Sequence, residues 1–309
     1  MKMAVASQTV VCSQGGHWSS SRSRRLLLSA VVAAVSLVAT SCLLNAPTDP
    51  GPLRFRDEIF TSVTTTTDVT YGQALSQSGV NTVLKADVYE PTADTALLRP
   101  LVIWVHGGSF KSGSKTSAEL VDEANYFSRK GYVNASISYR LSAQGCTVIN
   151  AACVESIVDA TEDAQAAVRF FRANAATYRI DPTRIAIGGS SAGAITAMNV
   201  GYRAVVPGSS GTPGVSSEVK GAVSLSGARL LGTCDAGDAP ALLFHSTADP
   251  LVPYQWATDT IDCAHGAELW AQLVTWEGSG HVPYVENRAQ ILELTTNFLF
   301  NSLSVRPLI

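Results

Sequence analysis

The sequence predicts an α/β fold with a mostly parallel central sheet of about eight strands and helices on both faces. Short apolar runs alternate along the chain with longer segments of helical character, which is typical of parallel strands joined by crossover helices. Several runs, such as residues 100–106, are apolar at nearly every position, which indicates strands covered on both faces. With 309 residues, of which 46% are hydrophobic, the chain is long enough to bury one substantial core.

The charge pattern argues against a nucleic-acid partner. The formal net charge is −3, and 15% of the residues are charged. Lysine and arginine form no stripe along the body of the chain, so nothing favours binding to nucleic acid.

The N-terminal segment, residues 1–42, has the pattern of a secretion signal. Three arginines between residues 22 and 25 precede an uncharged, mostly apolar run at residues 26–40. This run is shorter than the roughly 20 residues that a transmembrane helix needs, although a retained membrane anchor is the alternative. Residues 39–42 resemble a bacterial lipobox, in which Cys42 becomes the lipidated first residue, and ordinary cleavage near residue 40 is the other possibility. We expect an exported bacterial protein, extracellular or held at the cell envelope, with membrane contact only through such a lipid.

Four cysteines remain after this segment, an even number that suits an oxidising compartment. Three pairings of Cys146, Cys153, Cys234 and Cys263 are formally possible. We favour Cys146–Cys153, which closes a short loop, together with Cys234–Cys263. No two cysteines have the C-x-x-C spacing, so a zinc or redox site is not indicated.

Residues 43–68 are expected to form a linker that leads into a first edge strand. The segment holds three prolines and ends in a run of threonines. The main folded domain is expected at residues 69–309. In its first half, residues 81–89 alternate like a strand and end before a proline, whereas residues 118–130 are amphipathic and end at a glycine. Further strands are predicted at residues 100–106 and 132–139, and a further helix at residues 154–176.

The second half repeats the alternation of strand and helix. Strands are predicted at residues 184–187, 220–226, 241–246 and 272–277, and helices at residues 256–265 and 286–301. The stretch 203–218 is rich in glycine, serine and proline, and it is the natural place for a lid. It is too short to form a large helical cap, so we expect a minimal one.

The segment around which the chain is organised is residues 188–193, which read GGSSAG and contain Ser191. A β-branched apolar strand precedes it, and a helix rich in alanine follows. This strand–turn–helix setting is what a G-x-S-x-G nucleophile elbow requires, with Ser191 at the tip of the turn. A serine hydroxyl needs a base to remove its proton, and the base needs a carboxylate to orient it.

The base and the carboxylate are sought at the carboxyl ends of later strands. Asp249 follows the strand at residues 241–246, whereas the rivals Asp235 and Asp238 precede it. His281 lies on a loop after the last predicted strand, unlike His106, His245 and His265, for which structural roles are expected. The order Ser191, Asp249, His281 therefore predicts a catalytic triad.

An oxyanion hole is predicted from two glycines and the residue after the serine. Gly107 and Gly108 follow the strand at residues 100–106, where glycines allow backbone N–H groups to approach a substrate. The N–H group of Ala192 would complete the set of donors.

Five motifs together resemble those of α/β-hydrolases of the esterase and lipase group, similar to hormone-sensitive-lipase-like and feruloyl or acetyl esterases. The motifs are HGGSF at residues 106–110, SYRL at 138–141, GGSSAG at 188–193, HSTADPLVPY at 245–254 and GSGH at 278–281. The resemblance covers residues 70–300 and departs from the family pattern at Ser109, where a third glycine is usual.

The resemblance implies a secreted or envelope-anchored carboxylic-ester hydrolase that works through an acyl-enzyme and needs neither a metal nor an organic cofactor. Its expected substrates are small or polymeric esters. A serine peptidase of the same fold and a non-catalytic binding protein are the alternatives. The sequence does not indicate the oligomeric state.

Overall fold

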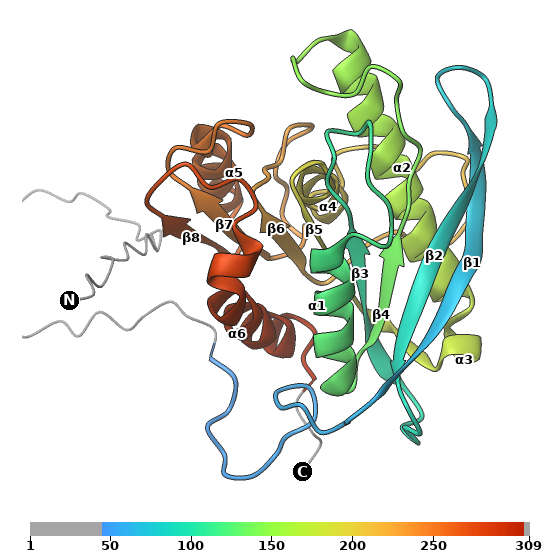
Figure 1. The fold of residues 1–309 in the computed structure, drawn as a ribbon, viewed down its shortest axis with the longest axis vertical. Helices are drawn as coiled ribbons and strands as arrows, with labels where there is room; N and C mark the ends of the chain where they lie inside the picture. Colours follow the sequence, from blue (N-terminus) through green and yellow to red (C-terminus); the bar gives the residue numbers. More distant parts are fainter. Residues whose placement is uncertain (1–44, 306–309) are drawn as a thin grey trace, which may run out of the picture.

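The computed structural model describes residues 45–305, so the predicted secretion signal and Cys42 lie outside the described part. Eight strands form one sheet in the order β1-β2-β4-β3-β5-β6-β7-β8 (Figure 1). β2 runs antiparallel to both β1 and β4, and every other neighbouring pair is parallel. The predicted fold class, a mostly parallel sheet of eight strands, is therefore confirmed.

From the third strand onward, most strands are followed by a helix. The strands are β1 (Val63–Leu75), β2 (Asn81–Pro91), β3 (Arg99–Val105), β4 (Val133–Ile137), β5 (Ile180–Ser190), β6 (Ala222–Leu225), β7 (Ala241–Ser246) and β8 (Ala271–Trp276). The helices are α1 (Ala118–Arg129), α2 (Ala151–Ala173), α3 (Ala175–Tyr178), α4 (Ala192–Gly201), α5 (Tyr254–Gly266) and α6 (Tyr284–Ser302).

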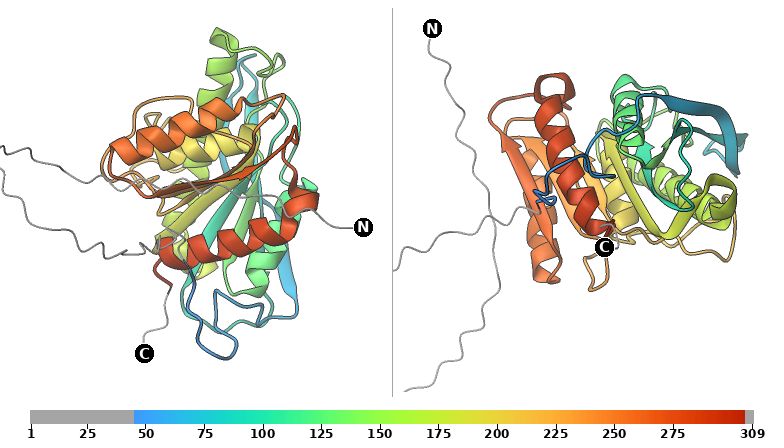
Figure 2. Two further views of the ribbon diagram at one scale, coloured as in Figure 1. Left: turned by 90° about the vertical axis from the view of Figure 1, so that its left-hand side faces the viewer. Right: turned by 90° about the horizontal axis from the view of Figure 1, so that it is seen from below.

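Two apolar layers sandwich the sheet, and β3 shows why its sequence is apolar throughout. Ile103 and its alternate neighbours pack in one layer with residues of α2, α4 and α5, whereas Val102 and Trp104 pack in the other with residues of α1 and α6. Figure 2 shows α5 and α6 on opposite faces of the sheet. Since successive side chains of a strand point to opposite faces, a strand covered twice needs apolar residues at every position.

The sheet order brings the four loops that carry the predicted site residues to one edge of the sheet. β3, β5, β7 and β8 run parallel within the sheet, so their carboxyl ends lie on the same side. The chain reverses its direction of travel across the sheet at β3, which has β4 on one side and β5 on the other. Ligands of open α/β sheets bind at such a switch point, beyond the carboxyl ends of the strands.

Helix α2 begins earlier than its apolar periodicity predicts. The Asn150 side chain caps the helix by accepting a hydrogen bond from the Cys153 amide at 2.9 Å, so the helix begins at Ala151, three residues before the predicted start. At its other end the chain turns into the short α3, which closes on Arg179 in the left-handed conformation. β5 then begins at Ile180, because that residue pairs with Arg99 of β3.

Residues 45–62 form no helix or strand, and hydrogen bonds hold them against the end of α1. The Phe55 amide donates to the Lys130 carbonyl at 2.7 Å. Arg54 donates to both carboxylate oxygens of Asp94, and it also donates to the Gly131 carbonyl at 3.0 Å. The segment runs past α6 and α1 into β1, as the blue stretch of Figure 1 shows. No helix within residues 45–305 combines the length and the apolar character that crossing a bilayer requires.

Candidate active site

Ser191 stands at a strained turn between β5 and α4. Its backbone has φ 52° and ψ −118°, a conformation that few residues other than glycine adopt. A Cβ atom at Gly189 or Gly193 would run into the backbone carbonyl of Val105, at the end of β3. The two glycines are therefore needed because β3 passes directly against the turn, and they leave the serine side chain projecting from it.

His281 reaches Ser191 from the loop after β8. Its Nε2 atom lies 2.8 Å from the Ser191 Oγ atom. The next residue, Val282, donates its amide to the Ser226 hydroxyl at 2.9 Å, which fixes this loop against the end of β6. The fold thus brings into contact an imidazole and a hydroxyl that are 90 residues apart in the sequence.

Asp249 lies behind the imidazole, on the loop after β7. Its carboxylate oxygens lie 2.8 and 3.0 Å from the His281 Nδ1 atom, and its side chain is fully buried. The amides of Leu251 and Val252 donate to its Oδ1 atom at 2.8 and 3.0 Å. The backbone of its own loop therefore holds the carboxylate in place beneath His281 (Ser191 lies on the opposite side of the ring).

The three predicted oxyanion donors surround the serine. A Cβ atom at Gly107 would lie 3.1 Å from the Ser191 Cβ atom, so the Gly107 backbone runs beside Ser191. Gly108 has φ +105°, and its carbonyl accepts the Lys111 amide at 2.9 Å. Among the described residues, the amides of Gly107, Gly108 and Ala192 donate to no protein group. Three N–H groups are thus left for a ligand beside Ser191.

The other described histidines hold loops and do not contact the serine. His106 is buried, its Nδ1 atom lies 2.6 Å from the Gly107 carbonyl, and burial lowers its pKa. His245 is also buried, lies 2.8 Å from the Val252 carbonyl, and has a pKa that burial lowers. His265 lies 3.1 Å from the Ala271 carbonyl. The first two are therefore neutral rings that position the glycine loop and the aspartate loop.

The rival carboxylates Asp235 and Asp238 belong to a different cluster. Asp238 accepts a hydrogen bond from the Arg203 Nε atom at 2.6 Å and another from the Asp235 amide at 2.8 Å. Both aspartates lie on the loop that enters β7, and neither contacts His281.

Both favoured disulfides are present, Cys146–Cys153 and Cys234–Cys263. The first lies next to the candidate site, because the Cys146 amide donates to the Ser109 carbonyl at 2.9 Å. The second joins the loop before β7 to α5. Disulfides are typical of proteins in oxidising compartments.

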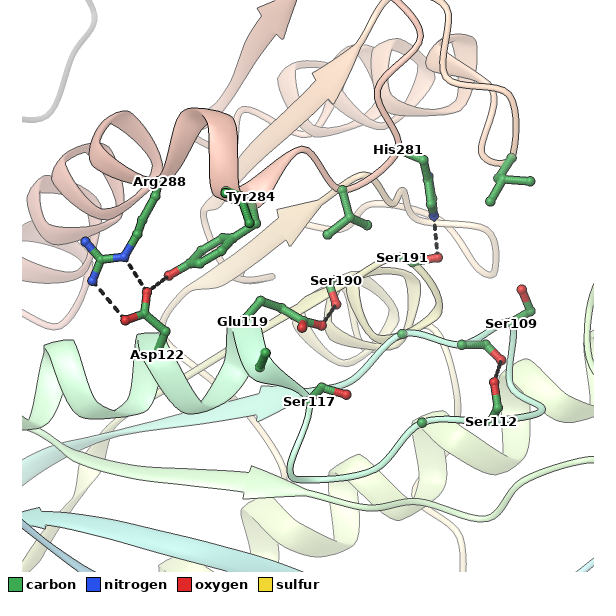
Figure 3. Close-up of a pocket in the computed structure, with 17 residues that line it drawn as sticks. Ser109, Ser112, Ser117, Glu119, Asp122, Ser190, Ser191, His281, Tyr284 and Arg288 are labelled. Atoms are coloured by element: carbon green, nitrogen blue, oxygen red, sulfur yellow. Dashed lines mark hydrogen bonds and ion pairs between the residues drawn. The ribbon is translucent and has the colours of Figure 1, made fainter.

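A cavity of about 700 Å³ opens on one side of Ser191. His281, Gly107 and Gly108 line it on the side of the reacting groups, and α1 and α6 supply much of the rest (Figure 3). Its polar lining includes residues that the sequence did not single out, namely Glu119, Asp122, Ser190, Tyr284 and Arg288. Ser190 donates to Glu119 at 2.9 Å, whereas the other three form a hydrogen-bonded cluster.

A smaller cavity of about 180 Å³ is also lined by Ser191 and is mostly apolar. Its large apolar side chains are Phe110, Ile149, Ile195, Leu230, Leu251, Val252 and Trp256. No residue of 203–218 lines either cavity, so the expectation that this stretch forms a lid is wrong. Instead, Arg169 of α2 binds it through the carbonyls of Ser210 and Thr212, because a buried guanidinium needs acceptors.

Comparisons with known proteins agree with the fold. The profile of the BD-FAE family matches residues 86–228, and that of the TAP-like protein family matches residues 224–303. Juvenile hormone esterase of Heliothis virescens is 29% identical over 162 residues, which are 50% of this chain and 26% of that protein. Gut esterase 1 of Caenorhabditis elegans is 30% identical over 95 residues, which are 31% of this chain and 17% of that protein. The chain thus spans about a quarter or less of these two relatives.

Solved structures match over most of their length. Esterase 2 of Thermogutta terrifontis, phosphonylated by cyclosarin, is 25% identical with a TM-score of 0.61, over 75% of this chain and 92% of that one. A truncated carbohydrate esterase from gut microbiota is 20% identical with a TM-score of 0.60, over 80% of this chain and 98% of that one, which is a likeness of fold. Together with the family profiles and the sheet order, these matches show that the chain has the α/β-hydrolase fold and is similar to esterases of that fold.

Proposed function

We propose that this protein hydrolyses carboxylic esters through a triad of Ser191, His281 and Asp249 and a covalent acyl-enzyme. The observation that carries the proposal is the continuous hydrogen-bonded chain from Ser191 through His281 to Asp249, beside three unpaired amides. The named relatives are esterases, which supports an ester over a peptide as the substrate.

The first half of the reaction forms the acyl-enzyme. The His281 Nε2 atom takes the Ser191 proton as the Oγ atom attacks the ester carbonyl carbon. Negative charge then develops on the carbonyl oxygen, where the amides of Gly107, Gly108 and Ala192 donate to it. Loss of one such donor typically lowers turnover by about 10²–10³-fold. Asp249 holds the imidazole in the required tautomer and stabilises its protonated form.

The second half regenerates the serine. The protonated His281 gives its proton to the leaving alcohol oxygen as the tetrahedral intermediate collapses. Water then enters, loses a proton to His281 and attacks the acyl carbon. The acid leaves, and the proton returns from His281 to Ser191.

The decisive test joins covalent labelling to a choice of substrate. The wild-type protein should react with a fluorophosphonate probe at Ser191 and should hydrolyse nitrophenyl acetate, whereas Ser191→Ala should do neither. Cleavage of a peptide anilide without cleavage of the ester would instead identify a peptidase. A folded wild-type protein that takes up no label would indicate a binding protein.

We also propose that the protein is exported, with residues 1–42 as its signal, 43–68 as a linker that leads into the first edge strand, and 69–309 as the catalytic domain. The two disulfides support an oxidising destination. If Cys42 is lipidated, processing should be sensitive to globomycin, and the mass of the mature N-terminus should include the lipid. A mature protein without lipid would show that Cys42 does not anchor it at the cell envelope.

A further inference from the structure

The larger cavity is the one from which the leaving alcohol must depart. His281 has to protonate the alcohol oxygen, and its side chain lines this cavity but not the smaller one. An ester whose alcohol oxygen lay beside His281 would therefore have its alcohol part in the larger cavity and its acyl part in the smaller, apolar one.

The charges that line the larger cavity do not cancel. Besides His281, its charged residues are Glu119, Asp122 and Arg288. Arg288 donates to both carboxylate oxygens of Asp122, at 2.5 and 2.9 Å, and Tyr284 donates to the same carboxylate at 2.7 Å. These bonds keep the pKa of Asp122 below its usual value, and Asp122 and Arg288 together form a neutral ion pair.

Glu119 has no such counter-charge. Its Oε1 atom accepts a hydrogen bond from the neutral Ser190 hydroxyl at 2.9 Å, and the described part of the chain offers it no ion-pair partner. It lies in the first turn of α1, where the helix dipole favours a negative charge. Figure 3 shows it beside Ser190, the residue that immediately precedes the nucleophile.

The neighbouring Glu123 does not add a second negative charge. It lies one turn further along α1 and is 4% exposed. Burial raises its pKa well above the usual value, which favours the protonated form. Several remaining walls of the cavity are apolar, including Leu251, Val282 and Val285. The cavity thus combines apolar walls with one uncompensated carboxylate next to the reacting serine.

We propose that Glu119 makes the alcohol side of the site select esters of positively charged alcohols over esters of negatively charged ones. The proposal rests on the esterase function proposed above and names the substrate class for it. A cation in this cavity would lie close to a carboxylate in a partly water-excluded space, where charge pairs are stronger than in bulk water.

The test uses three butyrate esters of similar size. They are butyrylcholine, its uncharged isostere with carbon in place of the quaternary nitrogen, and the ester of hydroxypropane sulfonate. For the wild-type protein we expect kcat/KM to fall in that order, with about a tenfold or greater preference for the cation over the isostere at low salt. Glu119→Gln keeps an acceptor for Ser190 and removes the charge, so the preference should fall to near one.

Two variants separate charge from local structure. Ser190→Ala removes the hydrogen bond but keeps the carboxylate, so the cation preference should persist. Glu277→Gln removes an equal charge from a residue outside the larger cavity and should leave the preference unchanged. If Glu119→Gln hydrolyses the isostere and retains the wild-type preference, the charge selection is wrong and the esterase function stands. If the wild-type protein hydrolyses nitrophenyl acetate but none of the three butyrates, the proposed alcohol class is wrong and the esterase function stands. If it hydrolyses neither, both proposals fail.

Discussion

At the scale of single residues, the orientation of His281 depends on a buried acceptor. In the proposed mechanism the Asp249 carboxylate accepts from the His281 Nδ1–H group, which lies 2.8 Å away, and so leaves the Nε2 atom free to take the Ser191 proton. An asparagine at 249 can still accept the Leu251 and Val252 amides, so the loop should keep its shape. Its amide group would favour the opposite tautomer of the imidazole, with the proton on Nε2.

We therefore expect Asp249→Asn to lower kcat by about 10⁴-fold while the melting temperature changes little. Ester hydrolysis followed across pH, together with thermal unfolding, measures both quantities. Asp238→Asn is the matched control, since it changes a carboxylate that binds Arg203 and does not contact His281. A kcat within tenfold of the wild-type value in Asp249→Asn would exclude this residue from the triad.

Lys130 is a buried lysine whose charge we expect to cost stability. Its side chain is 5% exposed, and burial lowers its pKa from 10.5 to about 8. Its ammonium group donates to the Arg56 carbonyl and lies 4.4 Å from the centre of the Tyr126 ring. Below pH 8 the lysine is charged in both the folded and the unfolded state, so the full desolvation cost of about 3 kcal/mol applies.

Lys130→Met should raise the free energy of unfolding at pH 7 by about 1–2 kcal/mol, because the desolvation cost exceeds the value of the lost hydrogen bond. Between pH 8 and 10.5 the folded protein releases this proton before the unfolded chain does, so the wild-type penalty fades as pH rises. Urea denaturation at pH 7 and pH 10 should show a smaller gain at the higher pH. A loss of stability at pH 7 would show that the contacts of Lys130 outweigh its desolvation.

At the scale of the elements, the strands and the loops that carry the proposed site residues could be predicted from the sequence. Each of these loops follows a buried strand. Gly107, Ser191, Asp249 and His281 all lie just beyond a strand's carboxyl end, and parallel strands bring such ends together. The local pattern of an apolar run followed by glycine or a polar loop carries this information.

The walls of the larger cavity could not be predicted in the same way. Tyr284 of α6 and Asp122 of α1 are 162 residues apart and meet only because both helices pack on one face of the sheet. In the sequence, both residues lie in helix turns with polar neighbours, where they resemble ordinary solvent-facing residues. The predicted lid failed for a similar reason, since nothing in residues 203–218 reveals that Arg169 of α2 binds their carbonyls.

Helix α5 supplies the largest side chain of the smaller cavity, Trp256. At about 180 Å³ this space equals that of roughly six water molecules, which suits a short acyl chain. Trp256→Ala should enlarge the cavity and shift the preferred nitrophenyl ester from a short to a longer acyl chain. The measurement is the ratio of kcat/KM for octanoate to that for butyrate.

Trp270→Ala is the matched control for this change. Trp270 stacks on Phe298 of α6 and lines neither cavity beside Ser191, so its loss should affect stability and not the ratio. A ratio that rises equally in both variants would mean that general loosening, and not the Trp256 side chain, admits longer chains.

At the scale of the whole molecule, the two disulfides differ in what they restrain. Cys234–Cys263 closes a loop with a sequence separation of 29, whereas Cys146–Cys153 spans only 7. If restriction of the unfolded chain dominates, the first contributes about 3.6 kcal/mol and the second about 2.5 kcal/mol. The shorter loop, however, is the one whose Cys146 amide holds the Ser109 carbonyl and whose residues line the smaller cavity.

We therefore expect the two bridges to separate stability from activity. Replacing Cys234 and Cys263 with alanine should cause the larger loss of unfolding free energy in urea and the smaller loss of kcat/KM for nitrophenyl butyrate. Replacing Cys146 and Cys153 should do the reverse, because the freed loop no longer fixes Ser109 beside the proposed oxyanion donors. Equal losses of activity in the two double variants would mean that the bridges act only through global stability, and four free thiols in the native exported protein would contradict both pairings.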